Sequence, residues 1–171
     1  MVRPLSFRVS SDLHAIHFAL KDILPVITPS HPPWLYSKPV LDLSLNKHAK
    51  FDISPEIFQS NFMAVCDELS DYHHIYTDGS KMNNSVAAAA ESRDKVKSLR
   101  IPDKASISTT ELVALNLALD IVWHSRHKKF VIFSDSLSCL LAIQNLQAEC
   151  GYVMKFLKNY TALVNTRWKI L

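Results

Sequence analysis

The order of strand-like and helix-like segments after residue 72 limits the fold of this chain more than any other feature of its sequence. Three short stretches rich in β-branched, aromatic or small apolar residues are typical of strands, at residues 73–79, 85–91 and 95–101. Helix and strand patterns then alternate: helix 109–124, strand 129–134, helices 136–147 and 152–164, and strand 168–171. Closely connected strands predict an antiparallel meander, and strand–helix units predict parallel strands. We therefore expect an α/β fold, in which helices pack on the faces of a mixed sheet.

The first 70 residues have a different pattern, of two helices joined by a proline-rich stretch. Leucine and isoleucine recur at helical spacing over residues 13–24. A second helix is predicted from Pro55, after the N-cap residue Ser54. Prolines 29, 32, 33 and 39 exclude a regular helix between the two, so Trp34 and Leu35 are expected in an extended segment.

The composition fits one globular domain with an appendage: 48% of the 171 residues are hydrophobic. We accordingly divide the chain into a mainly helical connector at residues 1–70 and the α/β domain at residues 71–171. No apolar run approaches the roughly 20 residues that cross a bilayer, and the chain does not begin like a signal peptide. Three cysteines without paired or metal-type spacing fit a reducing compartment. We expect a soluble intracellular protein with no membrane partner, in either nucleus or cytoplasm.

Three short motifs in the α/β domain each hold one acid in a different structural setting. Asp78 follows a strand pattern and has the small residues Gly79 and Ser80 beside it. Glu111 lies in the first turn of a predicted helix, and Asp135 ends an apolar strand, at the edge where sites gather in open α/β sheets. Three carboxylates that converge without basic partners repel one another, and divalent cations with oxygen ligands relieve that repulsion. Magnesium is therefore implied.

Each acid also has an explanation that involves no chemistry. Ser108-Thr109-Thr110-Glu111 has the pattern of a capping box, in which Glu111 bonds the backbone N–H of Ser108. Asp135 is placed to cap the next helix, and Asp78 is a common turn residue. These alternatives are independent of one another, so all three together are much less expected than one metal centre.

The histidines suggest zinc at two places, the pair His73-His74 and the pair His124 and His127. Adjacent strand residues point to opposite faces of a sheet, and two histidines at the end of a helix lack the further ligands that zinc needs. We expect no zinc site.

In order and setting, the three acidic motifs resemble the catalytic Asp, Glu and Asp of type-1 ribonuclease H, and the resemblance covers residues 71–171. It implies endonucleolytic cleavage of the RNA strand of an RNA–DNA hybrid, leaving a 3′-hydroxyl and a 5′-phosphate. It also implies two Mg²⁺ ions about 4 Å apart, for which Mn²⁺ is the expected substitute. Asp78 bridges both ions in this reading, and Glu111 and Asp135 bind one each.

The basic charge is concentrated in the same part of the chain. Residues 71–171 hold 13 Lys or Arg against 9 Asp or Glu, whereas residues 1–70 hold 6 against 7. Several basic or hydroxyl side chains near the first and middle motifs are candidates for contacts with the hybrid: Ser80, Lys97, Arg100 and Lys104. The alternative for the basic residues is an ordinary solvated face.

The connector resembles the segment upstream of the ribonuclease H domain in polyproteins of jockey-type non-LTR retrotransposons. This implies a reverse transcriptase domain upstream in a longer product, since this chain has no Tyr-x-Asp-Asp motif. The family's fourth carboxylate and its loop histidine have no counterpart before Leu171, so we expect a domain that is incomplete at its C-terminus and impaired in activity. Two other function classes stay open: a catalytically inactive nucleic-acid-binding remnant or spacer module, and a protein-interaction module.

Overall fold

The computed structural model describes residues 32–46, 54–82, 85–147, 150–166 and 168–171. The helix predicted over residues 13–24 lies outside this part of the chain. The strands are β1 His73–Met82, β2 Ser85–Ser92, β3 Val96–Ile101, β4 Lys129–Phe133 and β5 Lys169–Ile170. The helices are α2 Pro55–Glu68, α3 Ile107–Trp123, α4 Leu137–Gln144 and α5 Gly151–Asn165. Two single-turn 3₁₀ helices precede them, η2 Pro33–Leu35 and η3 Ser44–Asn46.

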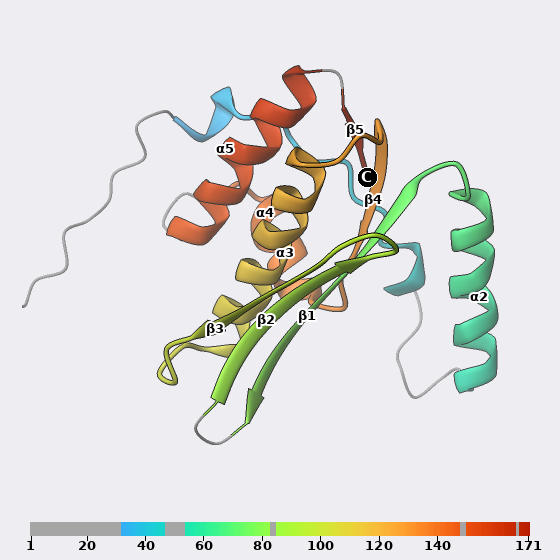
Figure 1. Cartoon of the computed structure of the whole chain (residues 1–171), viewed down its shortest axis with the longest axis horizontal. Helices are drawn as coiled ribbons and strands as arrows, with labels where there is room; N and C mark the ends of the chain where they lie inside the picture. The colour runs from blue at the N-terminus through green and yellow to red at the C-terminus, as the bar shows by residue number, and fades with distance from the viewer. Residues whose placement is uncertain (1–31, 47–53, 83–84, 148–149, 167) are drawn as a thin grey trace, which may run out of the picture.

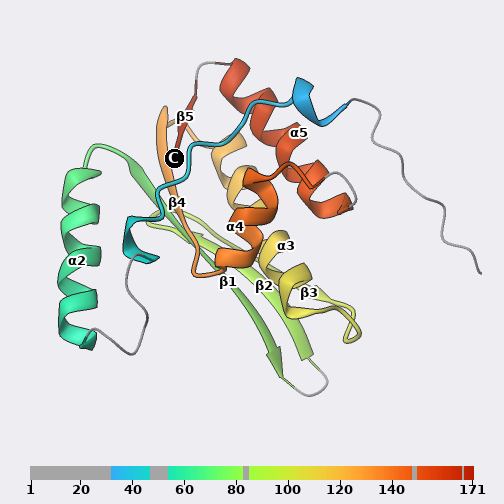
Figure 2. The same cartoon turned by 180° about the vertical axis from the view of Figure 1, so that it is seen from behind.

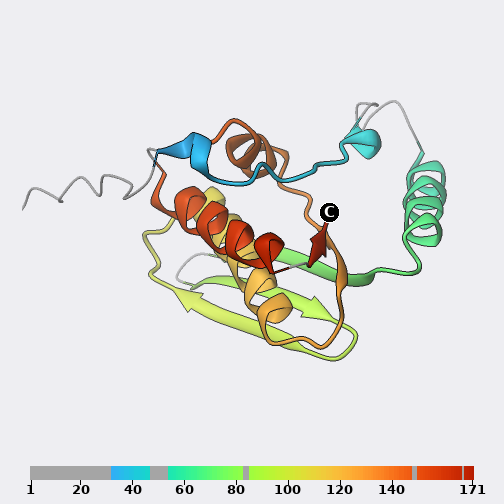
Figure 3. The same ribbon diagram turned by 90° about the horizontal axis from the view of Figure 1, so that it is seen from above.

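The five strands form one mixed sheet in the order β3-β2-β1-β4-β5 (Figure 1). β1 pairs antiparallel with β2, and β2 with β3, whereas β4 runs parallel to both β1 and β5. Helices α3 and α5 lie over one face of the sheet, and α2 stands apart from them (Figure 3). The predicted α/β class and the change from antiparallel to parallel pairing are confirmed.

The core lies between the sheet and α3. Along β1, Ile75, Thr77 and Gly79 are buried and alternate with exposed residues. β2 buries Ala88 and Ala90, and these small side chains let the helix approach the sheet closely. Helix α3 buries most of its length, and it is held by the sheet on one side and by α5 on the other.

Described residues that precede β1 contact the rest of the fold. Helix α2 begins at Pro55, as predicted, and the Ser54 hydroxyl accepts the Ile57 N–H at 3.5 Å. After η2 the chain runs along α5 toward η3 (Figure 2), and the Ser37 N–H donates to Thr161 Oγ1 at 2.8 Å. This bond ties the connector to the last helix of the domain.

The predicted extended conformation of Trp34 and Leu35 is wrong. Both residues belong to η2, in which the Leu35 N–H donates to the Pro32 carbonyl at 3.0 Å. A proline at the first position of such a turn loses no hydrogen bond, because the N–H there has no partner in any case. The prolines therefore exclude a long helix but not a single turn.

The three cysteines are free; Cys139 is buried, and Cys66 and Cys150 are half-buried. Within the described residues, no helix has both the length and the apolar character that a membrane crossing requires.

Candidate active site

The candidate site lies where the pairing of β1 with β4 stops. That pairing runs from His73 and Phe130 to Tyr76 and Phe133, and the rings of the last pair are stacked with centroids 5.3 Å apart. The Thr77 hydroxyl donates to the Phe133 carbonyl at 3.0 Å, which closes the end of the ladder. Beyond Tyr76, β1 continues to Met82 beside a β4 that has ended. Beyond Tyr76, the side of β1 that faces β4 is therefore unpaired, and this leaves an open edge at the centre of the sheet.

Asp78 and Asp135 both follow that last pair by two residues. Their strands run parallel, so the register brings the two acids to corresponding positions at the open edge. Asp78 is exposed and lies inside β1, opposite Ala89 of β2, so its interpretation as a turn residue is wrong. Asp135 is not the cap of α4 either, because the N-cap position is Ser136 and carries no side-chain cap bond.

Glu111 reaches the same edge from helix α3. The helix begins at Ile107 and is capped by Ser106, whose hydroxyl accepts the Thr109 N–H at 3.1 Å. The interpretation of Glu111 as part of a capping box is therefore wrong, because Ser108 lies inside the helix. Glu111 is instead the fifth helical residue, only 7% exposed, and it packs against the sheet.

Gly79 makes room for this carboxylate. A Cβ built at Gly79 lies 2.8 Å from the Glu111 backbone nitrogen and 2.9 Å from its Cδ and Oε1 atoms. Contacts this short require the helix or the carboxylate to move, so a residue without a side chain is needed at this position. The conformation of Gly79 is not the reason, since its φ is not positive.

The electrostatics of Glu111 report how the three acids are arranged. Burial, and after it the charges of Asp135 and Asp78, raise the pKa of Glu111 from 4.5 to about 7, against the opposing effect of a backbone hydrogen bond from Gly79. The Glu111 Oε2 atom is buried and has no hydrogen-bond partner among the described residues. A buried carboxylate oxygen without a donor, next to two further carboxylates, is a suitable ligand set for a hard divalent cation. The residues present thus fit the expected metal. Their ligand oxygens do not all lie within 4.8 Å of one another; among the described residues, the ligand atoms of His73, Asp94 and His127 do.

Two of the four predicted hybrid-contact residues lie on the same open face as Asp78. Ser80 pairs with Ala87, and Ala87 pairs with Arg100 on its other side, so the three form one row across the sheet. Side chains of directly opposed residues share a face, and Ser80 shares the face of Asp78 two residues away. The Arg100 guanidinium lies 3.7 Å from Asp103 and is largely exposed.

Lys97 lies on the other face. It is three residues from Arg100 in β3, and its ammonium forms an ion pair with Asp120 of α3. The structure therefore does not bring Lys97 to the face of the acids. Lys104 is exposed in the turn that follows β3.

Sequence reasoning missed two features. Thr77 closes the ladder beneath the acids, which only the register could reveal. The sequence suggested the pairs His73-His74 and His124-His127 as possible zinc ligands. In the structure, His73 instead lies beside His127, and Asp94 completes their cluster.

A cavity of about 1000 Å³ lies beside the acids, between α2, residues 40–46 and β4, with Asp135 among its lining residues. The lining is mainly apolar, from side chains such as Phe58, Phe62 and Val65. An apolar cavity does not suit a phosphate backbone, so the open face of the sheet is the better surface for a nucleic acid.

Comparison with known proteins agrees with the fold. The family model described as RNase H matches residues 70–170. A search of curated proteins returned no match. The matched segment covers more than half of the chain and contains all five strands and all three acids, so the chain belongs to the RNase H family.

Proposed function

We propose that this chain is a divalent-metal-dependent ribonuclease that cuts the RNA strand of an RNA–DNA hybrid endonucleolytically. Membership of the RNase H family supports the general activity. The observation that carries the metal dependence is the buried Oε2 of Glu111, which has no hydrogen-bond partner in the described part of the chain. Its carboxyl group has a pKa that is raised by burial, by Asp135 and by Asp78.

Asp78, Glu111 and Asp135 are the proposed ligands. When bound, two Mg²⁺ ions, or Mn²⁺ in their place, supply an activated water for attack on the phosphorus and neutralise the charge of the leaving oxygen. The chain's own contribution is to hold three carboxylates at one edge. Gly79 lets Glu111 approach β1, and the Thr77 hydroxyl fixes the end of β4 from which Asp135 follows.

The open face of the sheet is the proposed surface for the hybrid. Ser80 and Arg100 lie in one row beside Asp78, and exposed Lys104 follows the same strand as Arg100. Contacts of this kind bind phosphates without reading bases, so we expect cleavage with little sequence preference. Selection of RNA over DNA then depends on the 2′-hydroxyls and on the minor-groove shape of the hybrid.

The test compares wild-type protein with Asp78→Asn on a hybrid labelled in its RNA strand, with Mg²⁺, with Mn²⁺ and with EDTA. Asp67→Asn, an exposed aspartate on α2, is the matched control. We expect cleavage that needs the metal, is lost in Asp78→Asn and is unchanged in Asp67→Asn, with equal melting temperatures for all three proteins. Products should carry 3′-hydroxyl and 5′-phosphate ends.

Equal cleavage by Asp78→Asn and wild type contradicts the assignment of the acids. If the wild type binds the hybrid but does not cut it with either metal, the chain is a nucleic-acid-binding remnant or spacer module instead. Binding of neither hybrid nor metal favours an interaction module.

We further propose that the domain acts during reverse transcription of a non-LTR retrotransposon, with a reverse transcriptase domain upstream in a longer product. The support is the connector, whose proline-rich stretch and α2 helix precede the RNase H segment; Ser37, before α2, bonds to Thr161 of that segment. Sequencing of the full transcript tests this proposal, because an open reading frame without an upstream polymerase contradicts it.

A further inference from the structure

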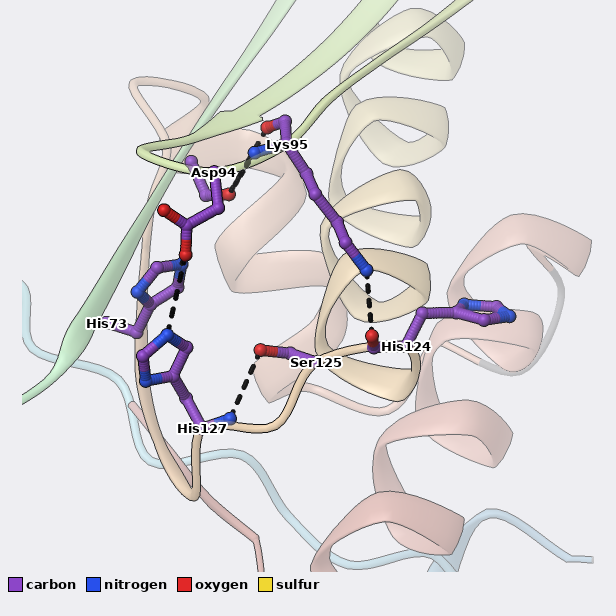
Figure 4. Close-up of polar contacts among 7 residues, drawn as sticks. His73, Asp94, Lys95, His124, Ser125 and His127 are labelled. Carbon is purple, nitrogen blue, oxygen red and sulfur yellow. Dashed lines mark hydrogen bonds and ion pairs between the residues drawn. The ribbon is translucent and has the colours of Figure 1, made fainter.

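A second group of metal-ligating side chains lies at the other end of β1. His73 opens that strand, Asp94 lies in the turn between β2 and β3, and His127 lies in the loop between α3 and β4 (Figure 4). One ligand atom from each residue lies within 4.8 Å of the other two. His73 precedes Asp78 by five strand residues, which corresponds to about 16 Å. This group is therefore separate from the acids.

The distances within the group are close to those of a metal site. Asp94 Oδ2 lies 3.5 Å from Nε2 of His127 and 3.9 Å from Nε2 of His73. Ligand atoms around a tetrahedral zinc ion, each about 2.0–2.1 Å from the metal, are about 3.3 Å apart. A contraction of the group, together with rotation of the imidazole rings, would bring the three atoms to bonding positions.

Independent contacts hold the backbone of each contributor. The turn that carries Asp94 is closed by Ser92, whose N–H donates to the Lys95 carbonyl at 2.8 Å and whose hydroxyl accepts the Lys95 N–H at 3.2 Å. The Lys95 ammonium donates to the His124 carbonyl at 2.7 Å, which joins this turn to the end of α3. Figure 4 shows the bond from Lys95 to His124 beside the cluster, with the ring of His124 pointing away from it. The turn that carries Asp94 is thus fixed to the end of α3 by contacts that do not involve the ligand atoms.

The two imidazole rings are also positioned by packing. They stack with centroids 4.1 Å apart and planes 12° apart, and both meet the ring of Phe130 edge-on. A metal lies in the plane of each imidazole that binds it, so binding requires the stacked rings to turn. His127, on a loop and half-exposed, has the freedom to do so.

We propose that His73, Asp94 and His127 bind a divalent transition-metal ion, Zn²⁺ in the first place. Two imidazole nitrogens and one carboxylate oxygen suit zinc, whereas Mg²⁺ and Ca²⁺ take mainly oxygen ligands. A cavity of about 620 Å³ lined by both histidines opens beside them and gives water access to the fourth position. Arg93, which also lines this cavity, places a positive charge nearby and limits the affinity.

Bound metal would fasten three segments that are distant in sequence: the start of β1, the turn before β3 and the loop before β4. Parallel pairing puts the amino ends of β1 and β4 together here, just as it puts Asp78 and Asp135 together at the other end. The role we assign is structural, because the group shares no residue with the acids. This inference does not depend on the proposed nuclease activity.

The test titrates metal-free protein with Zn²⁺ by calorimetry in excess Mg²⁺, and follows the histidine rings by ¹⁵N-resolved NMR. His127→Gln and Asp94→Asn remove exposed ligands with little risk to folding. His124→Gln is the matched control, since this histidine is equally exposed and close in sequence but points away from the cluster. Asp78→Asn controls for zinc at the acids.

We expect one Zn²⁺ per chain, shifts in the ring nitrogens of His73 and His127 alone, and a higher melting temperature with zinc. His127→Gln and Asp94→Asn should each weaken binding at least about 100-fold, since even outer-shell partners of a metal ligand are worth 10- to 100-fold. His124→Gln and Asp78→Asn should bind as wild type does. Zinc binding that survives in both ligand variants, or that is lost in Asp78→Asn, overturns the proposal. Absence of zinc binding by the wild type overturns it too, and the group would then be only an ion pair between Asp94 and the histidines.

Discussion

Glu111 combines two properties that both oppose its ionisation in the metal-free protein. Its carboxyl group is buried, and it lies near two other acids, so the proton is held more tightly in the folded than in the unfolded chain. Its pKa is raised from 4.5 to about 7. The stabilisation that follows is complete below about pH 4.5 and is lost as the pH rises through 7. The ionised form therefore costs roughly 3 kcal/mol of folding free energy at pH 8.

Glu111→Gln should remove this cost. In EDTA, the variant should match wild type near pH 4.5 and exceed it by up to about 3 kcal/mol at pH 8, because the amide stays neutral throughout. Urea unfolding of both proteins across this range measures the difference. Mg²⁺ at pH 8 should stabilise wild type more than the variant, since the ion favours the ionised carboxylate. A difference between the two proteins that is constant with pH would contradict this account of Glu111.

Gly79 and Gly151 are the two glycines of the chain, and they make opposite predictions. Gly79→Ala puts a methyl group 2.8–2.9 Å from the backbone and carboxylate of Glu111, so α3 or its acid must shift. We expect a loss of stability of about 1–3 kcal/mol and loss of cleavage. Gly151→Ala meets nothing within 4 Å at the start of α5 and should be neutral or stabilising by up to about 1 kcal/mol. Chemical denaturation of both variants checks the pair, and a harmless Gly79→Ala would show that the close approach is not needed.

At the scale of the element, the start of α3 decides where Glu111 points. Ser106 caps the helix, and the Thr110 hydroxyl donates back to the Ser106 carbonyl at 2.8 Å. Ser106→Ala should therefore cost about 1 kcal/mol, and Ser108→Ala, at an exposed position inside the helix, less than about 0.5 kcal/mol. Thermal unfolding of the two variants distinguishes the caps. A larger effect at Ser108 would restore the capping-box interpretation.

The elements themselves were largely predictable, and the reason is periodicity. β2 alternates buried and exposed residues, α2 begins at a proline behind a serine, and the strand Lys129–Phe133 is a short apolar run. Helix α3 begins at Ile107, two residues before the predicted start at residue 109. Ser106 and Ser108 are equally good caps by residue type, and only the backbone conformation selects one. The extended conformation predicted for Trp34 was wrong because proline is excluded from a helix interior but not from a single turn.

At the scale of the molecule, register holds the information that a sequence pattern lacks. The acids were found because three motifs each carried one, but their meeting depends on β4 ending opposite Tyr76. The cluster of His73, Asp94 and His127 could not be found in the same way, because its members share no motif. One of them begins a strand, and the other two lie in separate loops. Long-range pairing of β1 with β4 creates both groups at once, one at each end of the same two strands.

Register also divides the basic residues of β3 between the two faces of the molecule, and this leads to a matched prediction. Arg100 faces the open side of the sheet in the row of Ser80, and Lys97 pairs with Asp120 on the side of α3. Each has an acidic neighbour, so removal of either cation leaves one carboxylate behind. If the open side binds the hybrid, only Arg100 contacts phosphate.

Arg100→Ala should therefore weaken hybrid binding and lower the slope of log K against log salt by about 1, whereas Lys97→Ala should leave the slope unchanged. Fluorescence anisotropy with a labelled hybrid, measured over a series of salt concentrations in the Asp78→Asn background, gives both slopes without cleavage. Because each phosphate contact releases condensed counterions, the slope counts contacts and is insensitive to small changes in fold stability. Equal slopes for the two variants would mean that the nucleic acid does not lie on the open face, even if the acids prove catalytic.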